Sequence, residues 1–241
     1  MKISENTIFI SGGSAGIGLA IAKKLSAAGN KIIINGRSEE RLQNALKELD
    51  NAVAIQGDLS VEADRLHIAA QLKEQHPGVN IIINNAAEGF TYLLNQVTNA
   101  HKKATIEMDT NYISVIHFTE LLLPHLLTRK EAAIINVTSI AVFGSSKYVP
   151  TYGATKAALH SYILALRQTY EENKNVQVYE VYPPLVNTTF SADIGGANGI
   201  PPSEVADELL IALEKDQLDV PVGETKKLYA ATQEAFAKLK N

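Results

Sequence analysis

Two residues four positions apart, Tyr152 and Lys156, could together transfer a proton. If their segment is helical, this spacing places both side chains on one face. A free tyrosine has a pKa of about 10, which is too high for proton exchange near neutral pH. A neighbouring ammonium group favours the phenolate and lowers that pKa. Such a pair can protonate a carbonyl oxygen or deprotonate an alcohol. The spacing alone is common, and an exposed pair on a helix is an equally good interpretation.

Two further polar residues could assist this pair. Ser139 ends an apolar run at Ile135–Ser139, and its hydroxyl could hold a substrate oxygen by a hydrogen bond. Asn111 lies in a segment of helical pattern, where asparagine is unfavourable. A buried amide in such a place indicates a polar network. The candidate catalytic residues are therefore Asn111, Ser139, Tyr152 and Lys156.

A glycine-rich segment near the N-terminus, Ser11–Gly18, has the composition of a phosphate-binding turn. Glycines there let the chain turn sharply from strand to helix and let a pyrophosphate approach the backbone. The free N–H groups at the helix start then face the anion. A glycine turn that binds nothing is the weaker alternative, because this one follows an apolar run and opens an amphipathic segment. The expected dinucleotide contacts are Gly12, Ser14, Gly16, Ile17 and Gly18.

The residues after the second apolar run bear on the choice of dinucleotide. A site for NAD places an Asp or Glu there, which accepts hydrogen bonds from the ribose 2′-hydroxyl. This sequence has Asn35, Gly36 and Arg37 instead. Arg37 can pair with a 2′-phosphate through its planar guanidinium, and Ser38 can add a hydrogen bond. We therefore expect NADP(H), with NAD(H) less favoured; a solvated Arg37 is the alternative. Asp58 is placed either to contact the adenine or to cap a helix.

The elements that must position these residues alternate between short apolar runs and longer segments of helical pattern. Continuous apolar runs are typical of parallel strands buried on both faces. Their alternation with helices predicts a doubly wound α/β sheet of the Rossmann type, with about seven strands, helices on both faces and right-handed crossovers. We expect one domain over residues 1–241. The expected strands are Thr7–Ile10, Lys31–Asn35, Ala52–Gln56, Asn80–Asn84, Ala133–Val137, Val176–Tyr182 and Asp219–Val222.

Two less regular segments bear on substrate binding. His101–Thr128 has the pattern of one long helix, which Pro124 must kink or end. Residues 188–202 are rich in Gly, Ser, Ala and Asn, and such a stretch in a compact domain is usually functional. We expect it to be a mobile loop that binds the substrate. Apolar residues that could line a pocket, or equally belong to the core or an interface, are Ile140, Val142, Phe143, Tyr148, Leu185 and Phe190.

Composition disfavours several other functions. The formal net charge is -4 with no basic stripe, which argues against nucleic acid or an anionic membrane surface as the main partner. The chain has no cysteine, so disulfides, thiolate catalysis and thiolate metal sites are excluded, and we expect no metal. No apolar run approaches the roughly 18 residues of a membrane span. The N-terminal apolar run is too short for a signal peptide. We expect a soluble cytoplasmic protein.

Together these motifs resemble those of the short-chain dehydrogenase/reductase family, from Thr7 to about Val222. They occur in the family's order: Ser11–Gly18, Asp58–Leu59, Asn84–Ala87, Ser139, Tyr152-x-x-x-Lys156 and Pro183–Thr188. The resemblance implies that the Asn-Ser-Tyr-Lys set is catalytic, that the lysine also holds the nicotinamide ribose, and that the asparagine supports a proton-relay water. It also implies cofactor contacts at Asp58, Leu59, Asn85, Ala86, Tyr152, Lys156, Pro183, Val186 and Thr188.

The sequence around Gly36-Arg37 and at Pro201–Ala206 resembles that of the DltE-like oxidoreductase subgroup. Two positions depart from the usual family pattern. Ala87 stands in place of the glycine of N-N-A-G, and Pro184 in place of the glycine of P-G. Proline lacks an N–H group and fixes φ near about -65°. Both changes affect the local backbone near the expected cofactor, and neither removes a catalytic side chain.

We expect an enzyme that transfers a hydride between NADP(H) and a small carbonyl or alcohol substrate, with Tyr152 as general acid and base. An alternative is a dinucleotide-binding sensor or regulator without efficient turnover, because a fold does not prove a function. A nucleotide-sugar epimerase or dehydratase is disfavoured by the chain length and the glycine spacing. The resemblance further implies a homodimer or homotetramer, formed through the helices at Asn111–Leu127 and Ala154–Tyr170.

Overall fold

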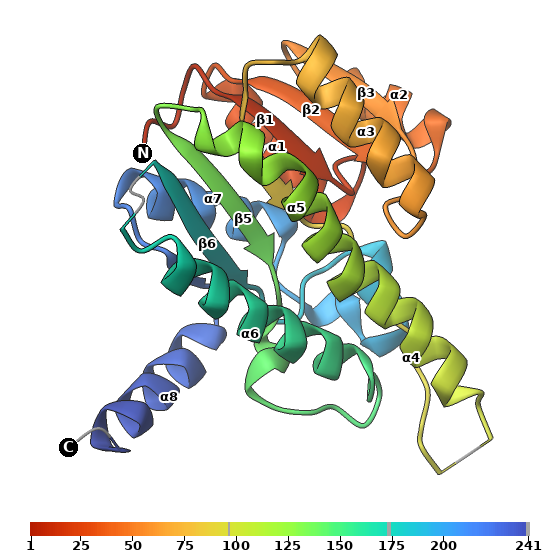
Figure 1. The fold of residues 1–241 in the computed structure, drawn as a ribbon. Coiled ribbons are helices and arrows are strands. Elements are labelled where there is room, and N and C mark those ends of the chain that lie inside the picture. Colours follow the sequence, from red (N-terminus) through yellow and green to blue (C-terminus); the bar gives the residue numbers. More distant parts are fainter. Residues whose placement is uncertain (96, 173–174, 240–241) are drawn as a thin grey trace.

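Seven parallel strands form the centre of the molecule in the computed structural model, which describes residues 1–95, 97–172 and 175–239. The strand order is β3-β2-β1-β4-β5-β6-β7, with helices on both faces (Figure 1), which confirms the predicted doubly wound sheet. Every predicted strand is present, with bounds that agree to within one residue. They are β1 (Thr7–Ser11), β2 (Lys31–Gly36), β3 (Ala52–Gln56), β4 (Val79–Asn84), β5 (Ala132–Val137), β6 (Val176–Tyr182) and β7 (Asp219–Pro221).

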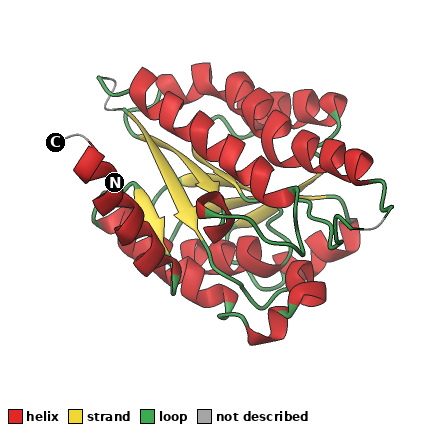
Figure 2. Cartoon of the chain, turned by 90° about the horizontal axis from the view of Figure 1, so that it is seen from below, coloured by secondary structure: helices red, strands yellow, loops and turns green. Residues whose placement is uncertain are grey.

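Successive side chains of a strand point to opposite sides of the sheet. Because the strands are largely continuous apolar runs, both faces of the sheet are apolar. Ile8 and Ile10 of β1 pack in the same core cluster as α1 (Gly16–Ala27), α2 (Glu39–Leu46) and α7 (Pro202–Glu214). Phe9, between them, packs on the opposite face with α3 (Glu62–Gln75) and α5 (Ser114–Leu127). On that same face, α6 (Tyr152–Thr169) packs against Val178 of β6. Figure 2 shows the strands between the two helical layers.

The segment predicted as one long helix is helical throughout from Ala100 to Leu127. It consists of α4 (Ala100–Met108), a π-helical turn at Asp109–Ile113, and α5. The sequence did not predict the π-turn, which contains the fully buried Asn111. π-turns occur mostly as single insertions and often at functional sites. Pro124 lies inside α5, near its end at Leu127.

The carboxyl ends of the strands meet at one edge of the sheet. The chain order reverses between β1 and β4, and ligands of open α/β sheets bind outside such a switch point. Short 3₁₀ turns at Ile140–Phe143, Thr189–Ile194 and Gly196–Asn198 follow β5 and β6. The last helix, α8 (Thr225–Leu239), extends away from the body of the molecule in Figure 1.

Among the described residues, no helix is both long and apolar enough to cross a membrane. The same part of the chain contains no cluster of three His, Cys, Asp or Glu side chains that could hold a metal ion.

Candidate active site

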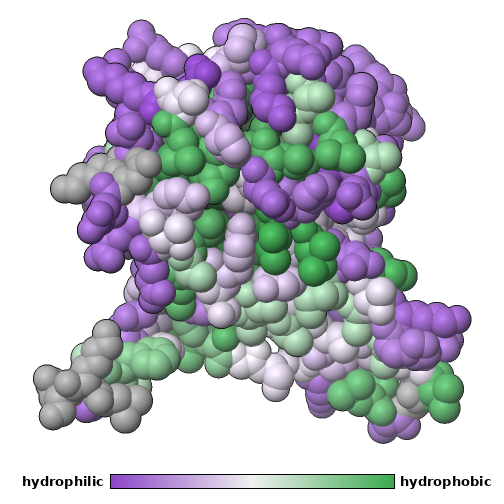
Figure 3. Space-filling view, viewed as in Figure 1, coloured by the Kyte–Doolittle hydropathy of each residue, from purple (hydrophilic) through white to green (hydrophobic). Residues whose placement is uncertain are grey.

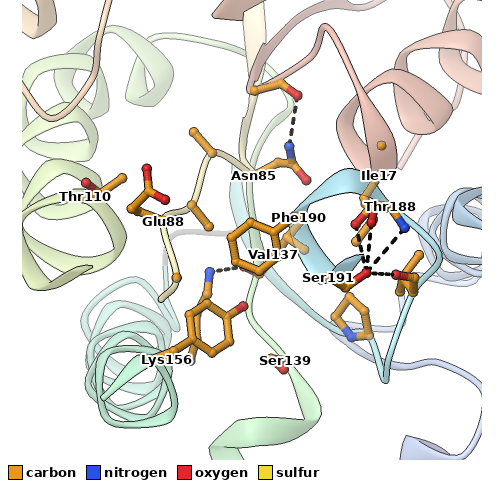
Figure 4. A pocket seen from close by; sticks show the side chains of 18 of the residues that line it. Ile17, Asn85, Glu88, Thr110, Val137, Ser139, Lys156, Thr188, Phe190 and Ser191 are labelled. Atoms are coloured by element: carbon orange, nitrogen blue, oxygen red, sulfur yellow. Dashed lines mark hydrogen bonds between the residues drawn. The ribbon is translucent and has the colours of Figure 1, made fainter. Parts of the chain in front are cut away.

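One cavity of about 760 Å³ lies at the carboxyl ends of the strands. All predicted site residues line it except Gly18 and Asn111. The lining thus joins segments from along the chain, as the close view in Figure 4 shows. The predicted residues in the lining are Gly12, Ser14, Gly16, Ile17, Arg37, Ser38, Asp58, Leu59, Asn85, Ala86, Ser139, Tyr152, Lys156, Pro183, Val186 and Thr188.

The glycine turn is tied to the loop that follows β4. Ser11 Oγ accepts hydrogen bonds from the backbone N–H groups of Asn85 (2.9 Å) and Ala86 (3.0 Å). In return, Asn85 Nδ2 donates to the carbonyls of Ser11 (3.0 Å) and Gly12 (3.3 Å). These bonds hold the start of α1 against the β4 loop, so the predicted motifs at Ser11–Gly18 and Asn84–Ala87 form one unit.

Two glycines of this turn are required for different reasons. Gly16 begins α1 with φ +52°, and a Cβ there would lie 3.1 Å from Thr188 Cγ2 across the cavity. A side chain at Gly16 would therefore fill the space in front of the helix start. A Cβ on Gly18 would lie 2.3 Å from the Gly12 carbonyl oxygen and 2.5 Å from Asn85 Nδ2. Gly18 is thus behind the turn, where it permits close packing and does not line the cavity.

Charged side chains face one another at the end of the cavity near β2. Arg37 is 69% exposed, and its guanidinium lies 3.9 Å from Asp58 Oδ2 and 3.7 Å from Glu88 Oε2. Asp58 Oδ1 accepts from the backbone N–H (2.9 Å) and the hydroxyl (2.8 Å) of Ser60. Ser38 caps α2 by accepting a 3.3 Å hydrogen bond from Arg41 N. The alternative of Asp58 as a helix cap is wrong, because α3 begins only at Glu62, after Val61.

Tyr152 and Lys156 lie on the first turn of α6, as their spacing predicts. Lys156 is 2% exposed, and its Nζ donates to the Val137 carbonyl at 2.9 Å (Figure 4). The same Nζ lies 5.7 Å from the centre of the Tyr152 ring. The pKa of Lys156 is lowered to about 8, because burial lowers it more than the negative charge of Glu180 raises it.

The pKa of the Tyr152 phenol is raised above its ordinary value. Burial raises its pKa, a hydrogen bond from the Ser139 hydroxyl lowers it, and the charge of Glu107 raises it further. The net shift is upward, opposite to the direction expected from the lysine alone, because burial disfavours the phenolate more than the other groups favour it. A neutral phenol is the form that can donate a proton. Ser139 Oγ also accepts from Ala141 N at 3.1 Å, which fixes its position at the end of β5.

Asn111 does not line the cavity, but its side-chain amide hydrogen-bonds to Glu88 and Thr155. Its Oδ1 accepts from the backbone N–H of Glu88, and its Nδ2 donates to the Glu88 carbonyl, both at 2.8 Å. Nδ2 also donates to Thr155 Oγ1 at 2.9 Å, and Thr155 Oγ1 donates to the Tyr152 carbonyl at 2.8 Å. The predicted polar network is therefore present. It connects the β4 loop with the turn of α6 that carries Tyr152 and Lys156.

The segment after β6 closes the cavity on the remaining side. The backbone N–H of Ile140 donates to the Pro183 carbonyl at 2.8 Å, which joins the ends of β5 and β6. The two departures from the family pattern, Ala87 and Pro184, both line the cavity. Ser191 Oγ donates to the Val186 carbonyl at 2.5 Å and accepts from Thr188 N at 3.4 Å. Residues 188–202 form two 3₁₀ turns and the start of α7, and their mobility stays a prediction.

The apolar residues suggested for a substrate pocket divide into two groups. Ile140, Leu185 and Phe190 line the cavity. Phe190 lies over Tyr152, with 5.7 Å between the ring centres. The other three residues of the group, Val142, Phe143 and Tyr148, do not line it.

Several lining residues were not predicted from the sequence. Arg41, one turn into α2, adds a second guanidinium near Arg37 and could have been found from its place after Ser38. Glu88 carries no signal in the sequence, because its contact with Arg37 joins two loops far apart in the chain. Thr91, Thr110, Ser145, Ser146, Val149, Ile194 and Leu228 also line the cavity.

Comparison with known proteins places this arrangement in a family. The family model for short chain dehydrogenases matches residues 6–198. The oxidoreductase DltE of Bacillus subtilis (strain 168) is 35% identical over 99% of this chain and 96% of its own. A short-chain dehydrogenase/reductase from Burkholderia phymatum, solved in complex with NAD, covers 100% of this chain and 97% of its own, with a TM-score of 0.86 and 19% identity.

A short chain dehydrogenase from Burkholderia cenocepacia J2315, solved in complex with NADP, has a TM-score of 0.85 and 23% identity and covers 100% of both chains. Because both solved structures are below 25% identity, they show the likeness of fold. The family itself follows from the family model and from the similarity to DltE. This chain belongs to the short-chain dehydrogenase/reductase family of oxidoreductases, in its DltE-like subgroup.

Proposed function

We propose that this oxidoreductase transfers a hydride reversibly between NADP(H) and a neutral carbonyl or alcohol substrate. The observation that carries the proposal is the joining of two sets of residues in one cavity. Tyr152, Lys156 and Ser139 line one part, and the glycine turn and Arg37 line another. In Rossmann sheets a dinucleotide binds across the switch point, so one such molecule could contact both sets of residues. The complexes of the two Burkholderia proteins with NAD and NADP support a nicotinamide dinucleotide here.

The cradle for the pyrophosphate fits this cofactor. The space in front of Gly16 is one that a Cβ would enter, and the start of α1 faces it. Arg37 and Arg41, with the Ser38 hydroxyl, supply donors for a 2′-phosphate at the end of β2. Across the cavity, the carboxylates of Asp58 and Glu88 lie near Arg37. β2 itself ends without a carboxylate. In an NAD site a carboxylate there accepts hydrogen bonds from the ribose 2′-hydroxyl, and it would repel the 2′-phosphate of NADP. Its absence therefore supports NADP over NAD.

When bound, the nicotinamide supplies the hydride donor or acceptor. The chain's own residues handle the proton. In carbonyl reduction, the Tyr152 phenol donates its proton to the substrate oxygen, and the Ser139 hydroxyl holds that oxygen by a hydrogen bond. The Lys156 ammonium stabilises the phenolate that forms, because the two groups lie on one turn of α6. Asn111 acts as a positioning residue through its bonds to Glu88 and Thr155.

The substrate end of the cavity favours a neutral molecule. The charged residues of the described lining are Arg37, Arg41, Asp58, Glu88 and Lys156. Four of them belong to the β2 end, where Arg37 contacts both carboxylates. The remaining side chains of the described lining are uncharged, and among them Phe190 lies beside Tyr152, with 5.7 Å between the ring centres. A carboxylate or phosphate group on the substrate would find no partner there besides Lys156, so aldehydes, ketones and alcohols with apolar substituents are the proposed class.

A substrate screen tests this function. Purified protein is incubated with NADPH or NADH and a panel of neutral aldehydes and ketones, and cofactor consumption is followed by absorbance. Turnover that is lost in Tyr152→Phe supports the proposal. Tight NADPH binding without turnover across the panel contradicts it and favours the alternative of a dinucleotide-binding regulator.

We further propose a symmetric homodimer or homotetramer formed through α5 and α6. A shallow hollow on the outer surface of these helices is lined by Ile116, Glu120, Leu123, Pro124, Leu127, Tyr162 and Tyr170. Figure 3 shows apolar side chains on this face of the molecule, among polar ones. Apolar surface of this kind on two adjacent helices suits a two-fold interface, in which each helix meets its own copy.

A further inference from the structure

A fully buried carboxylate lies behind the candidate catalytic pair. Glu180 is 0% exposed, in the middle of β6. It shares a strand face with Val178 and Tyr182, because side chains two positions apart point the same way. Val178 packs against α6, the helix that carries Tyr152 and Lys156. An ionised carboxylate in such a layer is costly unless hydrogen bonds and a positive charge compensate it.

The hydrogen bonds of Glu180 satisfy one of its two oxygens. Oε2 accepts from the Tyr182 hydroxyl at 2.9 Å and lies 2.9 Å from His160 Nδ1. Oε1 is buried and has no hydrogen-bond partner within the described part of the chain. His160 is 30% exposed, so it connects the buried carboxylate with the surface. The hydrogen bond to Glu180 raises the pKa of His160, against burial, which lowers it.

The neighbouring carboxylate in this layer already has a cation. Asp219 of β7 lies 2.9 Å from Arg167 Nη1. Its Oδ1 also lies 2.8 Å from the Tyr182 hydroxyl oxygen, whose single proton is shared between Asp219 and Glu180. Arg167 also donates to the backbone carbonyls of Val178 (2.9 Å) and Leu218 (2.8 Å), so its donors are committed to this end of β6. Among the described residues, the ion-pair partner of Glu180 is His160, at 2.9 Å, and not Arg167, and the Glu180 charge also acts on Lys156.

The geometry places Lys156 at the same layer. Lys156 and His160 are four residues apart, so they lie on one face of α6. Lys156 Nζ donates to the Val137 carbonyl on β5. The residue before Val137, Asn136, is the register partner of Glu180 in the β5–β6 pairing. The ammonium, the imidazole and the carboxylate thus lie together at the contact of α6 with β5 and β6.

We propose that Glu180 is a positioning residue whose buried negative charge keeps Lys156 an ammonium beneath Tyr152, with His160 linking that carboxylate to solvent. The inference rests on the proposed function, in which Lys156 acts in its charged form.

The balance of charges at Lys156 supports this role. Burial alone lowers the pKa of Lys156, and the Glu180 carboxylate is the group that opposes it, which leaves a pKa of about 8. Without that carboxylate, burial would act unopposed and Lys156 would lose its proton at a lower pH. The neutral amine could not stabilise a Tyr152 phenolate. Activity that needs the ammonium would then fall as the pH rises, and it would fall from a lower pH than in the wild type.

The other charged and titratable groups around the pair are accounted for. Tyr152 lies beside Lys156 on α6, and the charge of Glu107 raises the pKa of Tyr152. His160 faces Glu180 directly, Asp219 raises its pKa, and Arg167 lowers it. Among the described residues, Tyr182 on β6 and Tyr229 on α8 also lie in this layer, and the pKa values of both tyrosines are raised.

Glu180→Gln tests the proposal because it removes the charge and keeps the shape. The pKa of Lys156 is measured in the protein without cofactor, by NMR titration of lysines labelled with ¹³C at Cε, and the signal is assigned by its absence in Lys156→Met. We expect the pKa of Lys156 to fall by about one pH unit or more, the scale for loss of a close opposite charge. The alkaline limb of the kcat/KM profile should move to lower pH by the same amount.

Two matched variants separate charge from structure. Glu180→Asp keeps the charge and should restore most of the Lys156 pKa. Tyr182→Phe removes a hydrogen bond from the same carboxylate oxygen but keeps the charge, so it should leave the pKa of Lys156 close to that of the wild type. A merely structural role for Glu180 predicts the reverse: all three variants would lose stability, and none would shift the titration of Lys156.

A reciprocal measurement covers the case in which Glu180→Gln does not fold. Lys156→Met should raise the pKa of His160, because the carboxylate then has one positive neighbour fewer to compensate it. An unchanged Lys156 pKa in Glu180→Gln, or an unchanged His160 pKa in Lys156→Met, overturns the inference. Neither titration needs turnover. A wild-type protein that reduces no carbonyl would therefore refute the proposed function. The two titrations would still show whether the charges of Glu180 and Lys156 are coupled.

Discussion

Replacing Arg37 by alanine should weaken NADPH binding selectively. Arg37 is 69% exposed and lies 3.7–3.9 Å from the carboxylates of Glu88 and Asp58, contacts that as exposed pairs contribute about 0–1 kcal/mol each. A charge-assisted pair with a 2′-phosphate contributes about 1.5–3 kcal/mol. Giving up both contacts costs about 1 kcal/mol at the middle of that range, which leaves about 0.5–2 kcal/mol. The NADPH affinity of Arg37→Ala should thus fall about 2- to 30-fold, since about 1.4 kcal/mol is tenfold.

Calorimetric titration of NADPH and NADH into the wild type and Arg37→Ala measures this effect. The wild type should bind NADPH at least about tenfold tighter than NADH, and NADH affinity should hardly change in the variant. Glu88→Gln is a matched control, because it removes a competitor for Arg37 and should strengthen NADPH binding. Raising the salt concentration should weaken NADPH more than NADH. If Arg37→Ala leaves the ratio of the two affinities unchanged, Arg37 is a solvated residue and the reasoning fails.

The preference for NADPH over NADH could be reversed by adding a hydrogen-bond acceptor for the ribose. The position for that acceptor is Gly36, where a side chain would crowd its neighbours. A Cβ at Gly36 would lie 3.1 Å from Ser14 Oγ, so Gly36→Asp requires Ser14 to shift. Combined with Arg37→Ala it should favour NADH, through a carboxylate on the 2′-hydroxyl and the loss of the phosphate partner.

Three further outcomes are expected. Tyr152→Phe should cut turnover by roughly 10²–10⁴-fold, the scale of general acid–base catalysis, with NADPH affinity by titration nearly unchanged; near-normal steady-state turnover would remove Tyr152 from the mechanism. Gly16→Val should abolish NADPH binding, because φ is +52° and the side chain would enter the space before α1. Gly29→Val, at φ +86° and with nothing within 4 Å of its Cβ, controls for backbone strain, and a folded Gly16→Val protein that still binds would refute the cradle. Light scattering at micromolar concentration should show a dimer or tetramer that Leu123→Glu dissociates; a wild-type monomer would contradict the α5–α6 interface.

The parts of this protein that the sequence predicts are those encoded by local patterns. Most of the seven strands follow from runs that are largely apolar, because a strand buried on both faces favours apolar residues at successive positions. The glycine turn follows from Gly12, Gly16 and Gly18 between a strand and a helix, and the shared face of Tyr152 and Lys156 on α6 follows from their spacing. Each of these signals lies within one element, so tertiary contacts are not needed to recognise it.

Tertiary structure decided the features that depend on contacts between distant segments. The π-turn at Asn111 is absent from the helical pattern, because it forms where the amide bonds to Glu88 and Thr155. The sequence predicted that a lysine would lower the pKa of Tyr152, whereas burial, which depends on the packed fold, raises it. Glu180 interrupts an apolar strand in the sequence, and only the packing of α6 on β6 brings its charge close enough to act on Lys156. Local spacing identifies which groups can react; their charge states depend on desolvation and on neighbours that the fold brings together.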